Sequence, residues 1–237
     1  MSNDPIYFKR FVTMNEQVTC KPALAALGII AWAGVLLQFW LSINLALTNG
    51  KTVGEGIVVF LGYFTVLTNL FVTLTATLPI IMGSSRLGRW FGKPMVLGSA
   101  VTSILIVGIT YHFLLRNVWQ AQGLQLLADV VMHYVVPILA FAYWLVFPPR
   151  SKLGVLAPLA WCLYPMLYFV YVFTRGELLG SYPYYFIDVP KLGYGKVMFH
   201  SFGLLISFIV LGAAVLAVAA LRNRFLPPKN LVKSESG

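Results

Sequence analysis

The chain has 237 residues, of which 59% are hydrophobic and 10% charged, with 17 Lys and Arg against 7 Asp and Glu. Its mean hydropathy of +0.82 lies far above the range of soluble globular domains. This composition excludes a soluble enzyme, and it excludes a nucleic-acid-binding protein because no soluble segment is long enough to build a folded basic face. The sequence predicts an integral membrane protein.

Six apolar runs reach the length of about 20 residues that a helix needs to cross a bilayer. They cover approximately residues 23–47, 57–82, 95–115, 125–147, 154–173 and 197–221. Barrel strands would alternate polar and apolar positions, whereas these runs are apolar all round. We therefore predict an all-α integral membrane fold, a six-transmembrane-helix bundle in one domain.

That domain is expected over residues 23–221, between an N-terminal tail at 1–22 and a C-terminal tail at 222–237. Twelve of the 17 Lys and Arg residues lie in the two tails and in the loops after the second and fourth runs. Basic segments remain in the cytoplasm. Both termini are therefore predicted to be cytoplasmic, in a multi-pass protein of the cell membrane whose basic segments contact anionic headgroups.

The second run contains the stretch YFTVLTNLFVTLTATLP at residues 63–79, which carries five threonines and an asparagine. Spacings of three and four place most of these polar residues on one helical face, which should point into the bundle. This polar face consists of Thr65, Thr68, Asn69, Thr73 and Thr77. The later threonines, with Thr75, are expected to bond to carbonyls of their own helix or to neighbouring helices.

The fourth run holds His133, with Asp129 four residues earlier on the same face. An ionisable residue inside the bilayer is costly and marks a functional site. Thr65 and His133 each lie about eight residues from the outer end of their runs, which predicts similar depths. Because a carboxylate can orient an imidazole that takes a proton from a hydroxyl, we predict Thr65 as nucleophile, His133 as base and Asp129 as its orienting partner.

Other polar residues at similar depth are candidates to bind substrate or to stabilise an oxyanion. They are Thr68, Asn69, Tyr111 and His112. The outer connection at 174–196 is rich in Gly, Pro and Tyr and is expected to cap the outer face, where Tyr184, Asp188 and His200 would line a pocket. Tyr164, Tyr168 and Tyr171 form a stripe that either lines the pocket or bonds across helices.

Three segments carry a resemblance to a known family: YFTVLTNL around Thr65, MHYVVPIL around His133, and YPYYFID before the last run. Their order resembles the androgen-induced/FAR-type family of six-helix membrane proteins, and more closely its bacterial relatives called Pr-six-Pr proteins. The resemblance implies an intramembrane threonine-nucleophile hydrolase of lipid esters, such as fatty acid esters of hydroxy fatty acids, with Thr65 and His133 at the catalytic positions. The partner would be a membrane lipid or lipid ester.

Two other classes of function stay open. A non-catalytic lipid-binding protein or a small transporter would also hold a polar pocket in the outer half of the membrane, and prolines within the runs would mark broken helices. These are Pro137, Pro158 and Pro165.

Histidine ligation of haem or a metal is the other alternative. His112, His133 and His200 all fall in the predicted outer half, and no H-x-x-x-H spacing occurs. We expect no metal and no cofactor. The sequence leaves the oligomeric state open.

Overall fold

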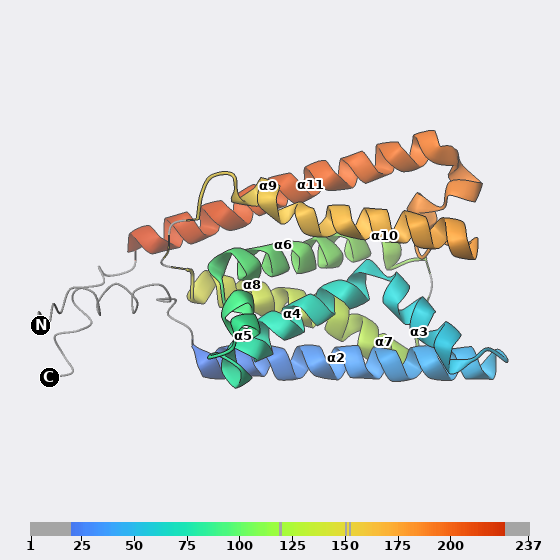
Figure 1. Cartoon of the computed structure of the whole chain (residues 1–237), viewed down its shortest axis with the longest axis horizontal. Coiled ribbons are helices and arrows are strands. Elements are labelled where there is room, and N and C mark those ends of the chain that lie inside the picture. The colour runs from blue at the N-terminus through green and yellow to red at the C-terminus, as the bar shows by residue number, and fades with distance from the viewer. Residues whose placement is uncertain (1–19, 119, 150, 152, 226–237) are drawn as a thin grey trace, which may run out of the picture.

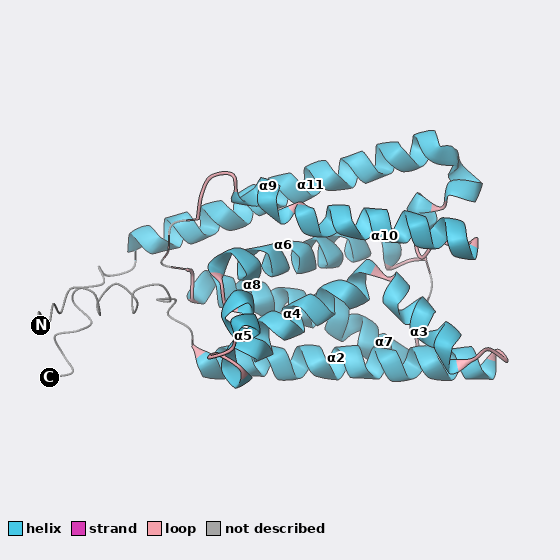
Figure 2. Ribbon diagram, viewed as in Figure 1, coloured by secondary structure: helices cyan, strands magenta, loops and turns pink. Residues whose placement is uncertain are grey.

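The computed structural model describes residues 20–118, 120–149, 151 and 153–225. Within these ranges the regular structure is entirely helical and contains no strand, which confirms the all-α prediction (Figure 2). Most of the two predicted tails lies outside the described residues. The ends of both tails nearest the domain are helical, since the first described helix begins at Lys21 and the last one ends at Phe225.

The helices succeed one another along the chain as shown in Figure 1. They are α2 (Lys21–Thr48), α3 (Val53–Gly62), α4 (Phe64–Ile81), α5 (Arg86–Phe91), α6 (Pro94–Thr110), the π-helix η1 (Tyr111–Leu115), α7 (Gly123–Val130), the π-helix η2 (Val131–Val135), α8 (Val136–Val146), α9 (Ala157–Trp161), α10 (Leu163–Leu179), the 3-10 helix η3 (Tyr185–Ile187) and α11 (Val189–Phe225).

Six helical segments of the described chain are long and apolar enough to cross a membrane. They span Lys21–Thr48, Phe64–Ile81, Pro94–Leu115, Gly123–Val146, Ala157–Leu179 and Val189–Phe225. The start of α2 and the end of α11 lie at the same end of the bundle in Figure 1. An even number of long helices, each running back along the one before it, brings the two ends together in this way.

The prediction of one continuous helix over the second run, 57–82, is wrong. The chain breaks at Tyr63, whose backbone is extended (φ −87°, ψ 130°), and this separates the short α3 from α4. A break frees backbone carbonyls, which an apolar medium tolerates only where protein groups bond to them. Here the Tyr168 hydroxyl donates to the Gly62 carbonyl at 3.0 Å, and the Tyr171 hydroxyl donates to the Leu61 carbonyl at 3.2 Å.

The outer connection is shorter than the predicted 174–196. Helix α10 continues to Leu179 and α11 begins at Val189, which leaves a linking segment of residues 180–188. The left-handed Gly180 (φ 62°) ends α10, and a bend at Gly193 (φ 74°) lets α11 start before its long straight part. Helices therefore extend further into the Gly- and Tyr-rich stretch than its composition predicts, because glycine accepts both backbone bends.

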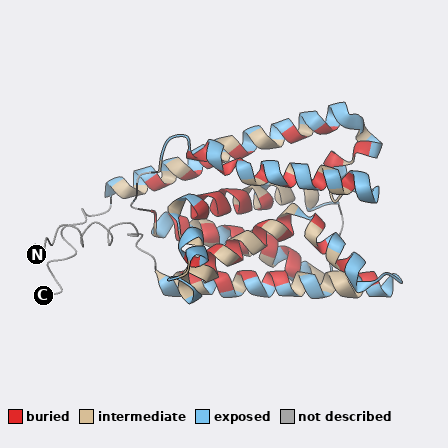
Figure 3. Cartoon of the chain, in the orientation of Figure 1, coloured by how far each residue is buried: buried red, intermediate tan, exposed pale blue. Residues whose placement is uncertain are grey.

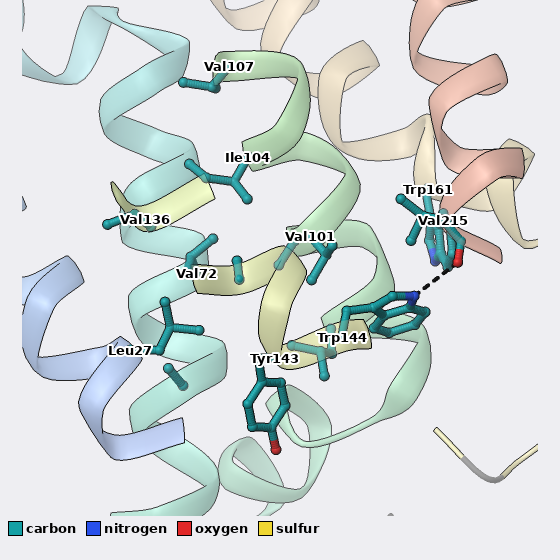
Figure 4. Close-up of a cluster of buried hydrophobic side chains, with 14 of the residues drawn as sticks. Leu27, Val72, Val101, Ile104, Val107, Val136, Tyr143, Trp144, Trp161 and Val215 are labelled. Carbon is teal, nitrogen blue, oxygen red and sulfur yellow. Dashed lines mark hydrogen bonds between the residues drawn. The ribbon is translucent and has the colours of Figure 1, made fainter. Parts of the chain in front are cut away.

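The largest apolar core lies between α2, α4, α6, α8, α9 and α11 (Figures 3 and 4). At its centre Trp144 is fully buried, and its indole N–H donates to the Val215 carbonyl of α11 at 2.9 Å. Helix α6 approaches α9 closely at Gly98, where an added Cβ would lie 2.3 Å from the Trp161 ring. This packing fixes the half of the bundle near α5.

Most of the polar face predicted on the second run is buried. Thr65, Thr68, Asn69 and Thr73 are less than 9% exposed, and Thr77 is partly buried. Thr75, which is not part of that predicted face, is buried as well. The Thr73 hydroxyl donates to the Asn69 carbonyl at 2.7 Å, and the Thr77 hydroxyl donates to the Thr73 carbonyl at 2.7 Å. The later threonines therefore bond within their own helix, as expected.

Candidate functional site

A cavity opens beside the start of α4, with about 630 Å³ of empty space including its open part. Helices α4, α6, η1, α10 and α11 and the 180–188 segment form its wall, which is mostly aromatic and aliphatic. The hydroxyl-bearing residues in the wall are Thr65, Thr110, Tyr168 and Tyr184. The cavity is therefore an apolar chamber in which few polar groups can orient a ligand.

Thr65 occupies the first turn of α4, where backbone N–H groups have no partner within the helix. Its N–H donates to the Tyr184 hydroxyl at 3.3 Å, and its side-chain hydroxyl also interacts with that phenol. Burial raises the pKa of Tyr184 to about 12, although the bonds from Thr65 act in the opposite direction. The phenol therefore stays neutral, and the positive end of α4 faces the cavity.

Thr68 lies one turn further along α4 and contacts α10. Its hydroxyl and that of Tyr164 are 3.2 Å apart, and either can be the donor. The Phe64 ring packs against Tyr164 and Tyr168, with centroid distances of 5.4 and 4.9 Å. Thr68 and the tyrosine stripe therefore hold α10 against α4, and Tyr168 both bonds across helices and lines the cavity.

His133 belongs to a second polar cluster, on α7 and the two π-helices. Its Nδ1 lies 2.9 Å from the Asp129 backbone carbonyl and 3.8 Å from the carboxylate oxygen Oδ1. The other carboxylate oxygen, Oδ2, accepts a bond from the Tyr111 hydroxyl at 3.2 Å. Tyr111 also stacks on the imidazole, with 3.8 Å between ring centroids.

The Asp129 backbone carbonyl makes the hydrogen bond to His133, and the Asp129 carboxylate lies beside the same ring nitrogen. A carbonyl oxygen can only accept, so a neutral His133 carries its proton on Nδ1 and keeps a lone pair on Nε2. The imidazole therefore has the tautomer that a general base requires.

Both π-helices carry residues of this cluster: Tyr111 and His112 lie in η1, and His133 lies in η2. A π-turn bonds residue i to i+5, which adds one residue to the turn and rotates the side chains that follow it. Such turns occur frequently at functional sites. Helix α6 approaches η2 closely at Gly108, where an added Cβ would lie 2.9 Å from the His133 carbonyl. The hydropathy pattern contained no sign of either π-turn.

Asn69 connects the surroundings of Thr65 with the polar cluster around His133. Its side-chain Nδ2 donates to the Thr65 carbonyl at 2.9 Å and to the Met132 carbonyl of η2 at 3.3 Å. Its Oδ1 is buried without a hydrogen-bond partner among the described residues. One side-chain amide therefore bonds to the carbonyl of Thr65 and to the carbonyl of the residue before His133. Within the described chain, however, no hydrogen bond joins the Thr65 hydroxyl to His133.

The remaining predicted site residues lie apart from the Thr65 hydroxyl. His112 contacts the Tyr134 hydroxyl and Arg116, each at 3.2 Å. His200 Nδ1 lies 2.9 Å from the Phe186 carbonyl and so holds the 180–188 segment against α11. Asp188 forms an ion pair with Lys191 at 2.8 Å beside the first turn of α11. In the described part of the chain, no three His, Cys, Asp or Glu side chains come together as a metal site would require.

No protein-family model matches this chain. No curated protein matches it in sequence, and no solved structure matches it in fold. The site must therefore be interpreted from its own chemistry. Sequence reasoning missed Thr110, which lines the cavity, and missed the helix start that places Thr65 in the first turn of α4. The only local sign of that turn was Gly62 directly before the polar stretch, and glycine alone does not predict a break.

Proposed function

We propose that the protein is a membrane-embedded hydrolase of lipid esters, with Thr65 as nucleophile and His133 as general base. The observation that carries the proposal is the position of Thr65: a buried hydroxyl in the first turn of α4, facing an apolar cavity beside Tyr184. The sequence resemblance to the androgen-induced/FAR-type and Pr-six-Pr proteins rests on the segments around the same two residues and supports the same roles.

Insertion in a membrane is part of the proposal. Six helical segments have the necessary length and hydropathy, and large apolar side chains such as Phe199, Val170 and Ile138 are more than 60% exposed on their outer faces. Lipid would cover these faces without cost. The excess of basic residues in the tails and in two loops favours cytoplasmic termini in the cell membrane.

The cavity wall favours a substrate with acyl chains. Phe169, Leu204 and Phe208 contribute to an almost entirely apolar surface, which suits a hydrocarbon chain and not a water-soluble molecule. A lipid ester would place its carbonyl near the few hydroxyls of the wall. Fatty acid esters of hydroxy fatty acids, which the resemblance implies, combine these features.

The reaction would be an acyl transfer in two steps. Thr65 Oγ1 attacks the ester carbonyl carbon while its proton passes to His133 Nε2, and collapse of the intermediate releases the alcohol, which takes that proton. Water then attacks the acyl-threonine, with His133 again accepting and returning a proton, to release the fatty acid. The Tyr184 hydroxyl, which accepts from the Thr65 N–H, is a candidate donor to the developing oxyanion.

A non-catalytic lipid-binding protein or a small transporter is the second candidate. It is favoured by the lack of a hydrogen bond, among the described residues, between the Thr65 hydroxyl and His133. Catalysis requires that bond to form when a substrate binds, as catalytic bonds often tighten only in the substrate complex. Lipid binding requires only the cavity.

The test is to label the purified, detergent-solubilised protein with a fluorophosphonate probe and to locate the adduct by mass spectrometry. We expect an adduct on Thr65 that disappears in Thr65→Ala and falls about a hundredfold or more in His133→Ala. Thr73→Ala is the matched control, because Thr73 is buried on the same helix and its hydroxyl donates to the Asn69 carbonyl within that helix. This variant should label like the wild type.

Thermal unfolding of each variant, followed by circular dichroism, must show that it is folded. A folded wild type that neither labels nor cleaves lipid esters would contradict the hydrolase and leave the cavity as a binding or transport site. Labelling at a residue other than Thr65 would overturn the assignment of the nucleophile.

A further inference from the structure

A second cavity lies at the opposite end of the bundle, between α2, α4, α5, α6 and α8, with about 960 Å³ of empty space including its open part. Two basic residues at its rim, Lys21 of α2 and Arg89 of α5, are the charged members of its described lining, and none is acidic. Arg89 Nη1 donates to the Ser84 carbonyl. This cavity shares no wall residue with the one beside Thr65.

The charge around this second cavity is uniformly positive over the described residues. The acidic side chains of the described chain are Glu55, Asp129, Glu177 and Asp188. They belong to α3, α7, the end of α10 and the 180–188 segment, at or toward the other end of the bundle (Figure 1). No described carboxylate is therefore placed to neutralise Lys21 and Arg89, and an anion from outside is the natural counter-charge.

The interior of the second cavity is both polar and apolar. Leu24 and Phe91 supply apolar wall, while Thr75 and Tyr143 supply oxygen atoms. In an α-helix the Thr75 carbonyl would accept a bond from the N–H of residue 79. That residue is Pro79, which has no N–H, so this bond within the helix is missing. A ligand with an anionic group, hydroxyl donors and an attached hydrocarbon would match the basic residues, the oxygen atoms and the apolar side chains of the wall, in that order.

We propose that this cavity binds an anionic phosphate headgroup, with Lys21 and Arg89 contacting the phosphate. Lysine and arginine at a membrane surface are the residues that recognise such headgroups. The site is separate from the ester-cleaving cavity and does not depend on Thr65 or His133.

The experiment measures lipid binding to the full chain in detergent by native mass spectrometry. Dioleoyl phosphatidylglycerol is compared with dioleoyl phosphatidylcholine, which has the same acyl chains and no net charge. We expect the anionic lipid to bind at least about tenfold more tightly, and Lys21→Gln/Arg89→Gln to reduce its affinity about tenfold. The control Arg86→Gln/Lys93→Gln removes two exposed charges at the same end that do not line the cavity, and its affinity should fall less than about twofold.

An equal loss in both double variants would overturn the site, because it would show general attraction to a basic end. An unchanged affinity in Lys21→Gln/Arg89→Gln would overturn it as well. Titration with inorganic phosphate at the ionic strength of a sodium chloride control separates two sources of the same chemistry. Displacement of the lipid by phosphate alone assigns the site to a free phosphate ligand, and retention of the lipid assigns it to a membrane headgroup.

Discussion

The two halves of the bundle satisfy their backbone polar groups in different ways. Near α5 the helices pack through large apolar side chains around Trp144, and the threonines of α4 bond within their own helix. Near α3 a broken helix and two π-helices free backbone groups, which side chains from distant helices then bond. Regular helices therefore build the scaffold, and the break before α4 places Thr65 at the cavity, whereas the π-helices hold the separate cluster of Tyr111, Asp129 and His133.

The largest effect is expected in the regular half, from Trp144→Ala. The substitution removes a fully buried indole and leaves the Val215 carbonyl without its donor, so the free energy of unfolding should fall by about 3–5 kcal/mol. Denaturant unfolding in detergent measures the loss. Trp90→Ala is the control, because Trp90 is 47% exposed and its loss should cost within about 0.5 kcal/mol. Similar losses in both variants would show that this core does not dominate stability.

A smaller effect is expected at the helix break, from Tyr168→Phe. Removing the hydroxyl leaves the Gly62 carbonyl buried without this donor, which should lower the free energy of unfolding by about 1–3 kcal/mol. Tyr171→Phe removes an equivalent bond to the Leu61 carbonyl that is exposed, and its cost should stay below about 1 kcal/mol. The same unfolding assay ranks the two variants. If Tyr171→Phe cost more, the break would not depend on the buried bond.

The smallest effect is expected at the start of α3, where Thr52 and Glu55 form a capping box. The Thr52 backbone N–H donates to the Glu55 carboxylate at 2.8 Å, and this bond lowers the pKa of Glu55 below its usual 4.5. The contribution of the charged form to folding is therefore present above pH 4.5 and is lost as the pH falls through the lowered pKa.

Hydrogen exchange of the α3 amides, corrected for the intrinsic effect of pH, measures this change. Protection should be constant above pH 4.5 and should decline as the pH falls through the lowered pKa of Glu55 and the carboxylate is protonated. In Glu55→Gln the protection should be lower and should not vary over this range. A wild type whose α3 protection is independent of pH would show that the capping box does not stabilise the helix.

The sequence was sufficient to predict the fold class, the number of long apolar helices and the buried polar face of α4. Each of these depends on local information, because a run of about 20 apolar residues or a spacing of four defines a helix and its faces without reference to the rest of the chain. The same information placed Tyr184 at a pocket and Asp129 beside His133, and the structure shows both. It did not predict the hydrogen bond between the Asp129 backbone carbonyl and His133 Nδ1. The catalytic roles of Thr65 and His133 stay predictions.

The break at Tyr63, the two π-helices and the link through Asn69 were decided by the tertiary structure. Each is stabilised by partners far away in the chain, and the donor to the Gly62 carbonyl lies 106 residues later. Hydropathy reports whether a segment suits an apolar medium, but it does not report which distant side chain will bond to a freed backbone group. The sequence by itself therefore determined which segments become helices, and only their packing decided where those helices break and which polar groups face the cavity.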